Sequence, residues 1–429
     1  MESLRTIVPE SGDVGLPYHE LVGPDSARFA DLSVITSVDD LASYTADLED
    51  LASDLAVQNP SYEPWVLLPI IRASAERRSF VFVLAFESHR VHGRRLVGFF
   101  PFERISIHSL MPVSCLRLWA DPFNYLNARC DPLIRCGNEA CIQDMLNWFT
   151  QGGAHAELLN LRGLTDGTSI ATAVSRYLST SKLTHTHSTI ESHLYRRHAD
   201  ARSYMDHVFS TKSQQTLRRY ERRLRELGPI EYSDVTEHTD IEVLADEFID
   251  LEDRGWKGQQ GVSVASYGHR DLVKGLLLEA HRRNRLSLLT LRIAKKIIAA
   301  RCVVLAKPGS FLFKLTYDES ETYSKRSPGL LLELEAIRRM HSDGELLGHQ
   351  VEWMDTCASP YSSIFGRSRS DALKVHRFLV ARPRTIGAIM LAMLPHMLIL
   401  RDALRTHGSQ LVHRVKAWRT RRGGVRGAT

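Results

Sequence analysis

The feature that most constrains the fold of this chain is a strand–turn–strand pattern that occurs twice, at residues 80–102 and 286–306. In both segments, apolar runs of strand length flank a short polar turn, which is typical of a β-hairpin. Helical patterns surround each hairpin, such as the leucine spacing over residues 41–55. Strands that alternate with helices in this way predict an α/β (mixed α+β) fold, in which helices flank a twisted mixed sheet. The matching places of the two hairpins suggest a duplicated domain.

The length of 429 residues is enough for two or three domains. We expect a first domain over residues 30–200, a second over 201–380 and a separate tail over 381–429. The first residues show no basic flank followed by an apolar run, so no secretory signal is predicted. A reducing cytoplasm is therefore the expected location.

The cysteine and histidine residues give no metal-binding spacing. Six cysteines are scattered over the chain without a C-x-x-C pair, which argues against a disulfide framework or a structural zinc site. Histidines 185, 187, 193 and 198 cluster, but no carboxylates accompany them at ligand spacing. We therefore predict no metal.

The charge of the chain is divided unevenly. The formal net charge is +5, but residues 381–429 carry +9, which leaves the first 380 residues with −4. A slightly acidic body with a basic tail does not predict a DNA partner.

The tail begins with fifteen nearly unbroken apolar residues, 386–400, between arginines and before the basic stretch HRVKAWRTRR. Three interpretations stay open. The segment is short for a membrane span and contains Pro395, it suits a helix buried against the body, and it also suits a helix in a membrane interface. The third interpretation would give peripheral membrane contact through the basic tail.

The segment over residues 311–340 contains a strand, a polar loop and a helix that begins at SPG. Ser327 suits the N-cap and Pro328 the first helical position, while Gly329 leaves the backbone free of a side chain. Lys325 and Arg326 stand just before this turn. Exposed helix-terminal N–H groups beside cations form a phosphate or pyrophosphate site. The alternative is an ordinary capped helix with two solvated cations.

Two further segments of this half have binding potential. The loop after Gly255 places Trp256 and Lys257 among glycines, which predicts that it lines a binding cleft. The helix over residues 212–227 carries six Lys or Arg residues against two Glu residues. It is either a cationic surface for an anionic donor or acceptor, or a solvated face with i,i+3 and i,i+4 ion pairs.

These pieces in order, TLRRYERRLRELG, LEDRGWKGQQG, LTLRIAKKIIAARCVVLA and FKLTYDESETYSKRSPGLLL, resemble the GNAT-superfamily acyltransferases of the CelD-like, or cellulose-biosynthesis, kind. Those are relatives of the Fem peptidyltransferases, which carry two GNAT-like domains in tandem. The resemblance covers roughly residues 205–340. It implies tandem GNAT-like domains, a degenerate first copy and a cofactor-binding second copy.

The resemblance also implies an acyl-CoA donor, with acetyl-CoA as the simplest. Its pyrophosphate would lie on the turn before the helix, where most GNAT proteins read Q/R-x-x-G-x-G/A and this chain reads RSPGLL, with one glycine instead of two. The hairpin turn also departs, with Lys295 and Lys296 in place of a glycine. The residues expected to hold the donor are Lys325, Arg326, Ser327, Pro328, Gly329 and Leu330.

Acyl transfer from a thioester to an amine needs a base for the amine, a donor that polarises the carbonyl, and protonation of the leaving thiolate. Glu252, Asp318 and Asp355 are the candidate bases. Tyr317 and Tyr323 are candidates for the thiolate proton. We expect Glu252, Asp318 and Tyr323 to be catalytic. The expected substrate-binding residues are Trp256, Lys257, Lys314 and Tyr317.

The sequence thus predicts a small-molecule N-acyltransferase, most simply an acetyltransferase. By resemblance, the acceptor is an amino sugar or similar amine in envelope or exopolysaccharide synthesis. Two alternatives stay open: a Fem-like transferase that uses aminoacyl-tRNA, and a non-catalytic scaffold that keeps the fold. The expected location is the cytoplasm, with contact at the inner membrane face as an addition.

Overall fold

The computed structural model describes residues 30–75, 78–89, 93–108, 111–123, 129–342, 345–346, 349–357 and 371–393. Most of the basic tail and the second half of the apolar segment 386–400 lie outside the described residues.

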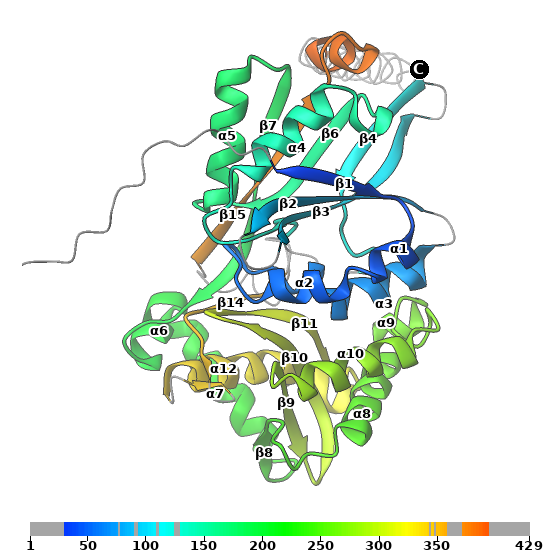
Figure 1. The fold of residues 1–429 in the computed structure, drawn as a ribbon. Coiled ribbons are helices and arrows are strands. Elements are labelled where there is room, and N and C mark those ends of the chain that lie inside the picture. The colour runs from blue at the N-terminus through cyan, green and yellow to red at the C-terminus, as the bar shows by residue number, and fades with distance from the viewer. Residues whose placement is uncertain are drawn as a thin grey trace, which may run out of the picture.

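One large mixed sheet of 13 strands runs through the described part of the molecule (Figure 1). The strands along it are β1 (Asp31–Ile35), β2 (Ser79–His89), β3 (Gly93–His108), β4 (Met111–Leu118), β6 (Leu158–Thr165), β15 (Asp371–Ala381), β7 (His185–Arg196), β14 (Trp353–Asp355), β11 (Gly309–Tyr317), β10 (Lys296–Ala306), β9 (Leu286–Ile293) and β8 (Ile230–Ser233), in that order. The thirteenth strand, β5 (Leu133–Ile134), pairs with β3. A separate small sheet joins β12 (Glu345–Leu346) and β13 (His349–Gln350).

The helices connect these strands. They are α1 (Val38–Ala42), α2 (Thr45–Ala52), α3 (Pro64–Ser74), α4 (Cys141–Thr150), α5 (Ser169–Ser181), α6 (Ala201–Val208), α7 (Thr211–Arg225), α8 (Ile241–Arg254), α9 (Trp256–Gln259), α10 (Arg270–Arg282), α11 (Glu321–Ser324) and α12 (Pro328–Ser342), with short 3-10 turns at Pro60–Tyr62 and Gly153–His155. The predicted mixed α+β fold is confirmed. Both predicted hairpins are confirmed as well, as β2–β3 and β9–β10.

The pattern of antiparallel and parallel pairing is the same from either end of the sheet. Each end begins with antiparallel strands and reaches a parallel pair, β4 with β6 on one side and β11 with β14 on the other. Between these pairs the two sides exchange a strand, because β15 pairs with β6 and β7 pairs with β14. Strands β7 and β15 also pair with each other. The division at residue 200 stays a prediction, and the sheet crosses it at this exchange.

Helices cover both faces of β9, β10 and β11. Alternate strand residues such as Leu288 and Cys302 pack on the side of α8 and α10, whereas Leu291 and Val303 pack on the side of α6, α7 and α12. This alternation is the period of two that a sheet buried on both faces requires.

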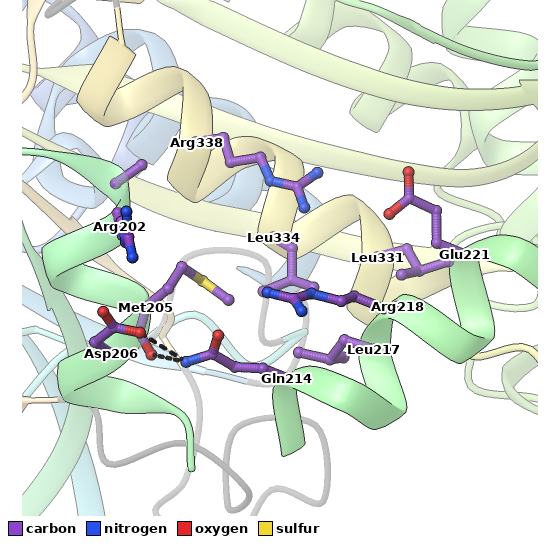
Figure 2. Close-up of a pocket in the computed structure, with 11 residues that line it drawn as sticks. Arg202, Met205, Asp206, Gln214, Leu217, Arg218, Glu221, Leu331, Leu334 and Arg338 are labelled. Atoms are coloured by element: carbon purple, nitrogen blue, oxygen red, sulfur yellow. Dashed lines mark hydrogen bonds between the residues drawn. The ribbon is translucent and has the colours of Figure 1, made fainter. Parts of the chain in front are cut away.

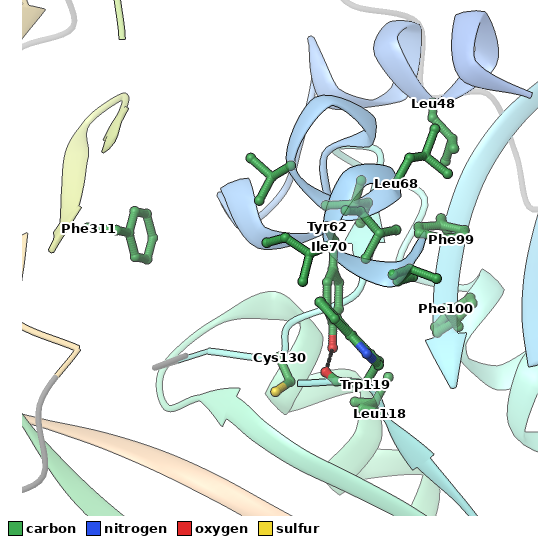
Figure 3. Packing of buried hydrophobic residues seen from close by; sticks show 14 of the residues in the cluster. Leu48, Tyr62, Leu68, Ile70, Phe99, Phe100, Leu118, Trp119, Cys130 and Phe311 are labelled. Atoms are coloured by element: carbon green, nitrogen blue, oxygen red, sulfur yellow. Dashed lines mark hydrogen bonds between the residues drawn. The ribbon is translucent and has the colours of Figure 1, made fainter. Parts of the chain in front are cut away.

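The core at the other end of the sheet is rich in aromatic side chains (Figure 3). Tyr62 lies within it, and its hydroxyl donates a hydrogen bond of 2.5 Å to the carbonyl of Trp119. The same buried cluster extends to Phe311 of β11, so one continuous core connects the two ends of the sheet. Ion pairs reinforce this connection: Arg283 bonds Glu49 at 2.8 Å, and Arg285 bonds Glu63.

Residues 386–393 form a helix at the end of the described chain. Leu391 is buried in a cluster with Val113 and Leu158. Ile386, Ile389 and Met393 remain exposed on the opposite side of this helix. Among the described residues, no helix combines the length and the apolar character that crossing a bilayer requires.

Candidate functional site

The candidate site lies where strand β11 separates from β14. The two strands pair in parallel at Gly309, Ser310 and Phe311 only, while β11 continues to Tyr317 along β10. The pairing with β10 shifts register between Cys302 and Val303, so β11 carries an extra residue at Phe313. Beyond Phe311 no described strand covers this edge of β11. A bulged, uncovered strand edge can receive an extended ligand by main-chain pairing.

Helix α12 begins next to this edge, at Pro328 as predicted. Ser327 before it adopts a positive φ of 47°, and its carbonyl accepts hydrogen bonds from the N–H groups of Leu330 and Leu331. The N–H of Ser327 donates to Ser324, and Pro328 has none. Among the amides of this turn, that of Gly329 has no acceptor in the described part of the chain. The turn therefore offers one N–H and the positive end of the helix to an anion.

The space beside Gly329 is occupied by protein. A Cβ atom at this position would lie 2.7 Å from Cδ1 of Tyr317. The expectation that the missing side chain leaves an open approach is therefore wrong on this side of the turn. The glycine allows α12 to pack against the end of β11 instead.

The two cations before the turn are engaged. Lys325 pairs with Glu321 at 2.5 Å, although both side chains are largely exposed. Arg326 donates to the carbonyl of Arg223 at 3.0 Å and to that of Thr322. Arg326 thus ties the turn to α7. Because Lys325 stays in solvent, it can exchange its partner for an anion at small cost.

Glu252 is the centre of a buried cluster on the other face of β11. Its side chain is fully buried, and one carboxylate oxygen accepts from Lys314 at 2.7 Å and Lys257 at 3.0 Å. The second oxygen accepts from the N–H of Val264 at 3.0 Å. Burial alone would raise the pKa of Glu252, but the two ammonium groups outweigh it and hold the pKa below its ordinary value. A carboxylate that accepts three hydrogen bonds and has a lowered pKa is a poor base. The contacts of Glu252 are instead those of a residue that positions Lys257 and Lys314.

Lys314 itself is nearly buried, and its pKa is lowered by burial and by Lys257, which outweigh the attraction of Glu252. The cluster therefore joins three predicted residues from three elements: α8, α9 and β11. Lys314 directly follows the bulge at Phe313, and its ammonium group lies on the α8 face of β11.

Asp318 directly follows β11 and is part of a second polar cluster. Its carboxylate accepts from Lys296 at 2.7 Å and from the N–H of Ser320 at 3.0 Å. Burial would raise the pKa of Asp318, but these bonds lower it overall. The ammonium group of Lys296 lies 5.2 Å from the ring centre of Tyr323. The structure thus brings Asp318 and Tyr323 together through the hairpin turn that departs from the family pattern.

Trp256 opens the short helix α9 rather than lying in a loop, and its side chain is 46% exposed. The backbone N–H of Trp256 donates to the carboxylate of Glu319, the residue after Asp318, at 2.7 Å. Gly258 permits this tight segment, because a Cβ there would lie 1.8 Å from the carbonyl oxygen of Asp253. The exposed indole therefore stands at the same end of β11 as the second polar cluster.

The comparison with protein families decides what this half of the chain is similar to. Residues 211–348 match the acetyltransferase (GNAT) domain family. This GNAT match covers about a third of the chain and includes β8 to β11 and α12. It supports the resemblance to GNAT acyltransferases for this part of the chain, and the CelD-like kind stays a prediction. No curated protein matches the chain in sequence.

Solved structures resemble the chain over most of its length at low identity. A conserved protein of unknown function from Bacteroides thetaiotaomicron VPI-5482 has 11% identity and a TM-score of 0.49, and the match covers 79% of this chain and 97% of that one. FemX has 6% identity and a TM-score of 0.47, with coverage of 81% and 96%. A tandem GNAT protein from the clavulanic acid biosynthesis pathway has 12% identity and a TM-score of 0.39, with coverage of 83% and 100%. Identities and TM-scores this low carry no information about the donor or the acceptor of this chain.

Asp355, the third candidate base, lies at the end of β14, opposite Phe311, the last residue at which β11 pairs with β14. One oxygen accepts from Arg129 at 2.9 Å and the other from the N–H of Cys357 at 2.8 Å, and the side chain is fully buried. Arg129 also lies over the ring of Trp353 at 4.3 Å. Asp355 is therefore a buried structural partner of Arg129, and both of its oxygens are bonded within the protein.

Helix α7, where the GNAT match begins, keeps most of its positive charge without ion pairs inside the helix. Among the described residues, one ion pair within it is seen, between Arg225 and Glu221 at 2.8 Å. The arginines of α7 are exposed, as a solvated face requires, but the expected series of i,i+3 and i,i+4 pairs is reduced to this one.

Three features of the site escaped the sequence reasoning: the lysine partners of Glu252, the contact of Tyr317 with Gly329, and the role of Lys296.

In the described residues, no group of three His, Cys, Asp or Glu side chains could hold a metal ion.

Proposed function

We propose that the chain transfers an acyl group, most simply acetyl, from an acyl-CoA to an amine at the edge of β11. The observation that carries this proposal is the separation of β11 from β14 after Phe311, beside a bulge and the start of α12, within the segment that matches the GNAT family. An extended pantetheine arm can pair with the uncovered strand edge. The diphosphate of the donor would then meet the N–H of Gly329 and the positive end of α12.

The reaction forms a bond from the amine nitrogen to the thioester carbonyl carbon and breaks the bond from that carbon to sulfur. The amine loses a proton and the leaving thiolate gains one. The lowered pKa of Asp318 means that it can pass the amine proton to water but not retain it at neutral pH. We therefore assign Asp318 to a proton relay and Tyr323 to protonation of the thiolate, and we assign Glu252 to positioning of Lys314.

Acceptor binding would involve the α9 segment. Exposed Trp256 offers a flat apolar surface, and Glu319 beside it offers a carboxylate. A ring that carries hydroxyl groups and an amine fits such a pair, because it stacks on the indole and donates to the carboxylate. This supports an amino sugar as acceptor, in agreement with envelope or exopolysaccharide synthesis.

The test is thermal melting with acetyl-CoA, longer acyl-CoAs, free CoA and charged tRNA, each added to the full chain. The proposal expects a raised melting temperature with the CoA species alone, and release of free thiol when amino sugars are added with acetyl-CoA. A rise with charged tRNA alone would replace it by Fem-like aminoacyl transfer. No rise with any donor would favour a scaffold that keeps the fold.

We also propose a cytoplasmic location with contact at the inner membrane face through the C-terminal segment. The exposed side chains of Ile386, Ile389 and Met393 form an apolar stripe on the last described helix. The sequence continues with seven more residues of mainly apolar character and then a basic stretch. An apolar stripe followed by cations is the combination that binds an anionic membrane surface.

A further inference from the structure

A groove separates α7 from α6 and α12 (Figure 2). Its main lobe has a volume of about 500 Å³, and a second lobe of about 190 Å³ adjoins it at Leu217, which lines both. The second lobe reaches Leu330 in the first turn of α12. A groove of this combined size can hold a small-molecule ligand.

The floor of the main lobe is apolar. It is formed by Met205, Leu217, Leu331 and Leu334, three of which are buried leucines. Figure 2 shows Leu331 and Leu334 of α12 facing Leu217 of α7, with Met205 on the α6 side. Such a floor favours a ligand with an apolar body.

The rim of the same lobe carries three arginines from three helices: Arg202, Arg218 and Arg338. Figure 2 shows the guanidinium groups of Arg218 and Arg338 directed into the space between α7 and α12, with Arg202 on the facing wall. Neither Arg202 nor Arg218 has an ion-pair partner among the described residues. Arg338 bonds Glu335 at a longer distance of 3.7 Å.

The acidic side chains of the rim are already engaged. Glu221 pairs with Arg225, and Asp206 accepts from Gln214 at 3.0 Å. Gln214 also donates to the carbonyls of Met205 and Phe209, so it fixes α6 against α7. Gln214 therefore holds the wall of the groove together. The lining carries three arginines against the two carboxylates of Asp206 and Glu221, so its net charge is positive.

From these observations we infer that the groove binds a phosphate ester with an apolar body, which the arginines hold by the phosphate and the leucine floor by its apolar part. A phosphate presents three acceptor oxygens and nearly two negative charges to guanidinium groups from several sides. The phosphate can come from two sources: the nucleotide end of a coenzyme or the headgroup of a lipid. The inference does not depend on acyl-CoA being the donor.

The experiment is isothermal titration calorimetry of the full chain at about 150 mM salt, where diffuse attraction is screened. The probes are adenosine 3′,5′-bisphosphate for the nucleotide source and dihexanoyl phosphatidic acid for the lipid source. Adenosine and dihexanoylglycerol, which lack the phosphates, are the matched ligands. We expect one phosphate probe to bind and its matched ligand to show no binding heat.

The variants separate a groove from a general cationic surface. Arg218→Glu should weaken the bound probe by at least about tenfold, because a charged hydrogen-bond donor is replaced by a repelling carboxylate. Arg223→Glu makes the same charge change on the same helix at a residue that lines neither lobe, and should change affinity less than about twofold. Both positions are exposed, so both variants should fold.

Three results would overturn the inference: no heat with either phosphate probe, equal binding of the ligands that lack phosphate, or equal weakening by the two variants. If acyl-CoA fails to stabilise the chain but the lipid probe binds with this pattern, the proposed reaction fails and the groove stands. If acyl-CoA stabilises the chain and both phosphate probes fail, the reverse holds.

Discussion

Gly329 and Tyr317 lie in contact at the point where helix α12 meets the end of β11, and a single methyl group on Gly329 would stand 2.7 Å from the tyrosine ring. The glycine thus controls how closely the helix start approaches the strand edge. In a site built from these two elements, this contact sets the distance between an anion on the turn and a group on the strand.

Gly329→Ala should therefore both destabilise the protein and weaken acetyl-CoA binding. Overpacking of this kind costs about 1–3 kcal/mol of unfolding free energy. The double variant Gly329→Ala, Tyr317→Leu should recover most of the loss, because the smaller side chain makes room. A double-mutant cycle from urea unfolding measures this coupling. Strictly additive losses would show that the two residues do not act through their contact.

Glu252→Gln should destabilise the protein by about 3–5 kcal/mol at neutral pH, because it leaves Lys257 and Lys314 without their carboxylate. Glu242→Gln is the control, since Glu242 is exposed and pairs with Lys274 at 3.7 Å, and its loss should stay within about 0.5 kcal/mol.

The stability effect of Glu252→Gln should depend on pH. The pKa of Glu252 is lowered in the folded state from an ordinary value of 4.5, so its carboxylate stabilises the fold fully above that pH. As the pH falls through the lower folded pKa, this contribution is lost. The stability difference between wild type and Glu252→Gln, measured by urea unfolding, should be constant from about pH 6 to 8 and shrink below about pH 4.5. A difference that grows on acidification would contradict the ionised state of Glu252.

Gly258→Ala and Gly275→Ala should have opposite effects. A Cβ at Gly258 meets a backbone oxygen at 1.8 Å, so the α9 segment must move, and the cost should exceed about 2 kcal/mol. Gly275 lies on α10, where an added Cβ would meet nothing within 4 Å, and alanine there should raise stability by about 0.5–1 kcal/mol through helix propensity. Thermal melting of the two variants provides the measurement. Equal changes in melting temperature would mean that the α9 segment tolerates displacement.

The double variant Ile386→Glu, Ile389→Glu should lower cosedimentation with vesicles that contain phosphatidylglycerol. Both side chains are exposed on the last described helix, so their replacement removes apolar contact without opening the core. Val243→Glu, an equally exposed site on α8, is the matched control and should sediment as wild type does. Unchanged binding in the double variant and in a deletion of residues 383–429 would remove the membrane from the proposed function.

Much of the local structure could be predicted from sequence, because periodicity and turn residues record local preference. The hairpins and the start of α12 at Pro328 are examples. Strand β15 was missed, although Leu373 and Val375 give an alternating signal. The partners of Glu252 could not be predicted, since Lys314 is sixty-two positions away and spacing does not record which face of β11 it shares. The contact between Tyr317 and Gly329 depends in the same way on a helix packing angle that no pattern encodes.

The exchange of β7 and β15 affects how the chain can fold during synthesis. Strand β6 pairs with β4 on one edge, but its other edge is covered only when residues 371–381 have left the ribosome. Until then a nascent first half presents an open edge that could pair with another molecule. A fragment that stops at residue 200 should therefore aggregate when expressed alone, and a chaperone that shields the β6 edge would aid assembly of the complete protein.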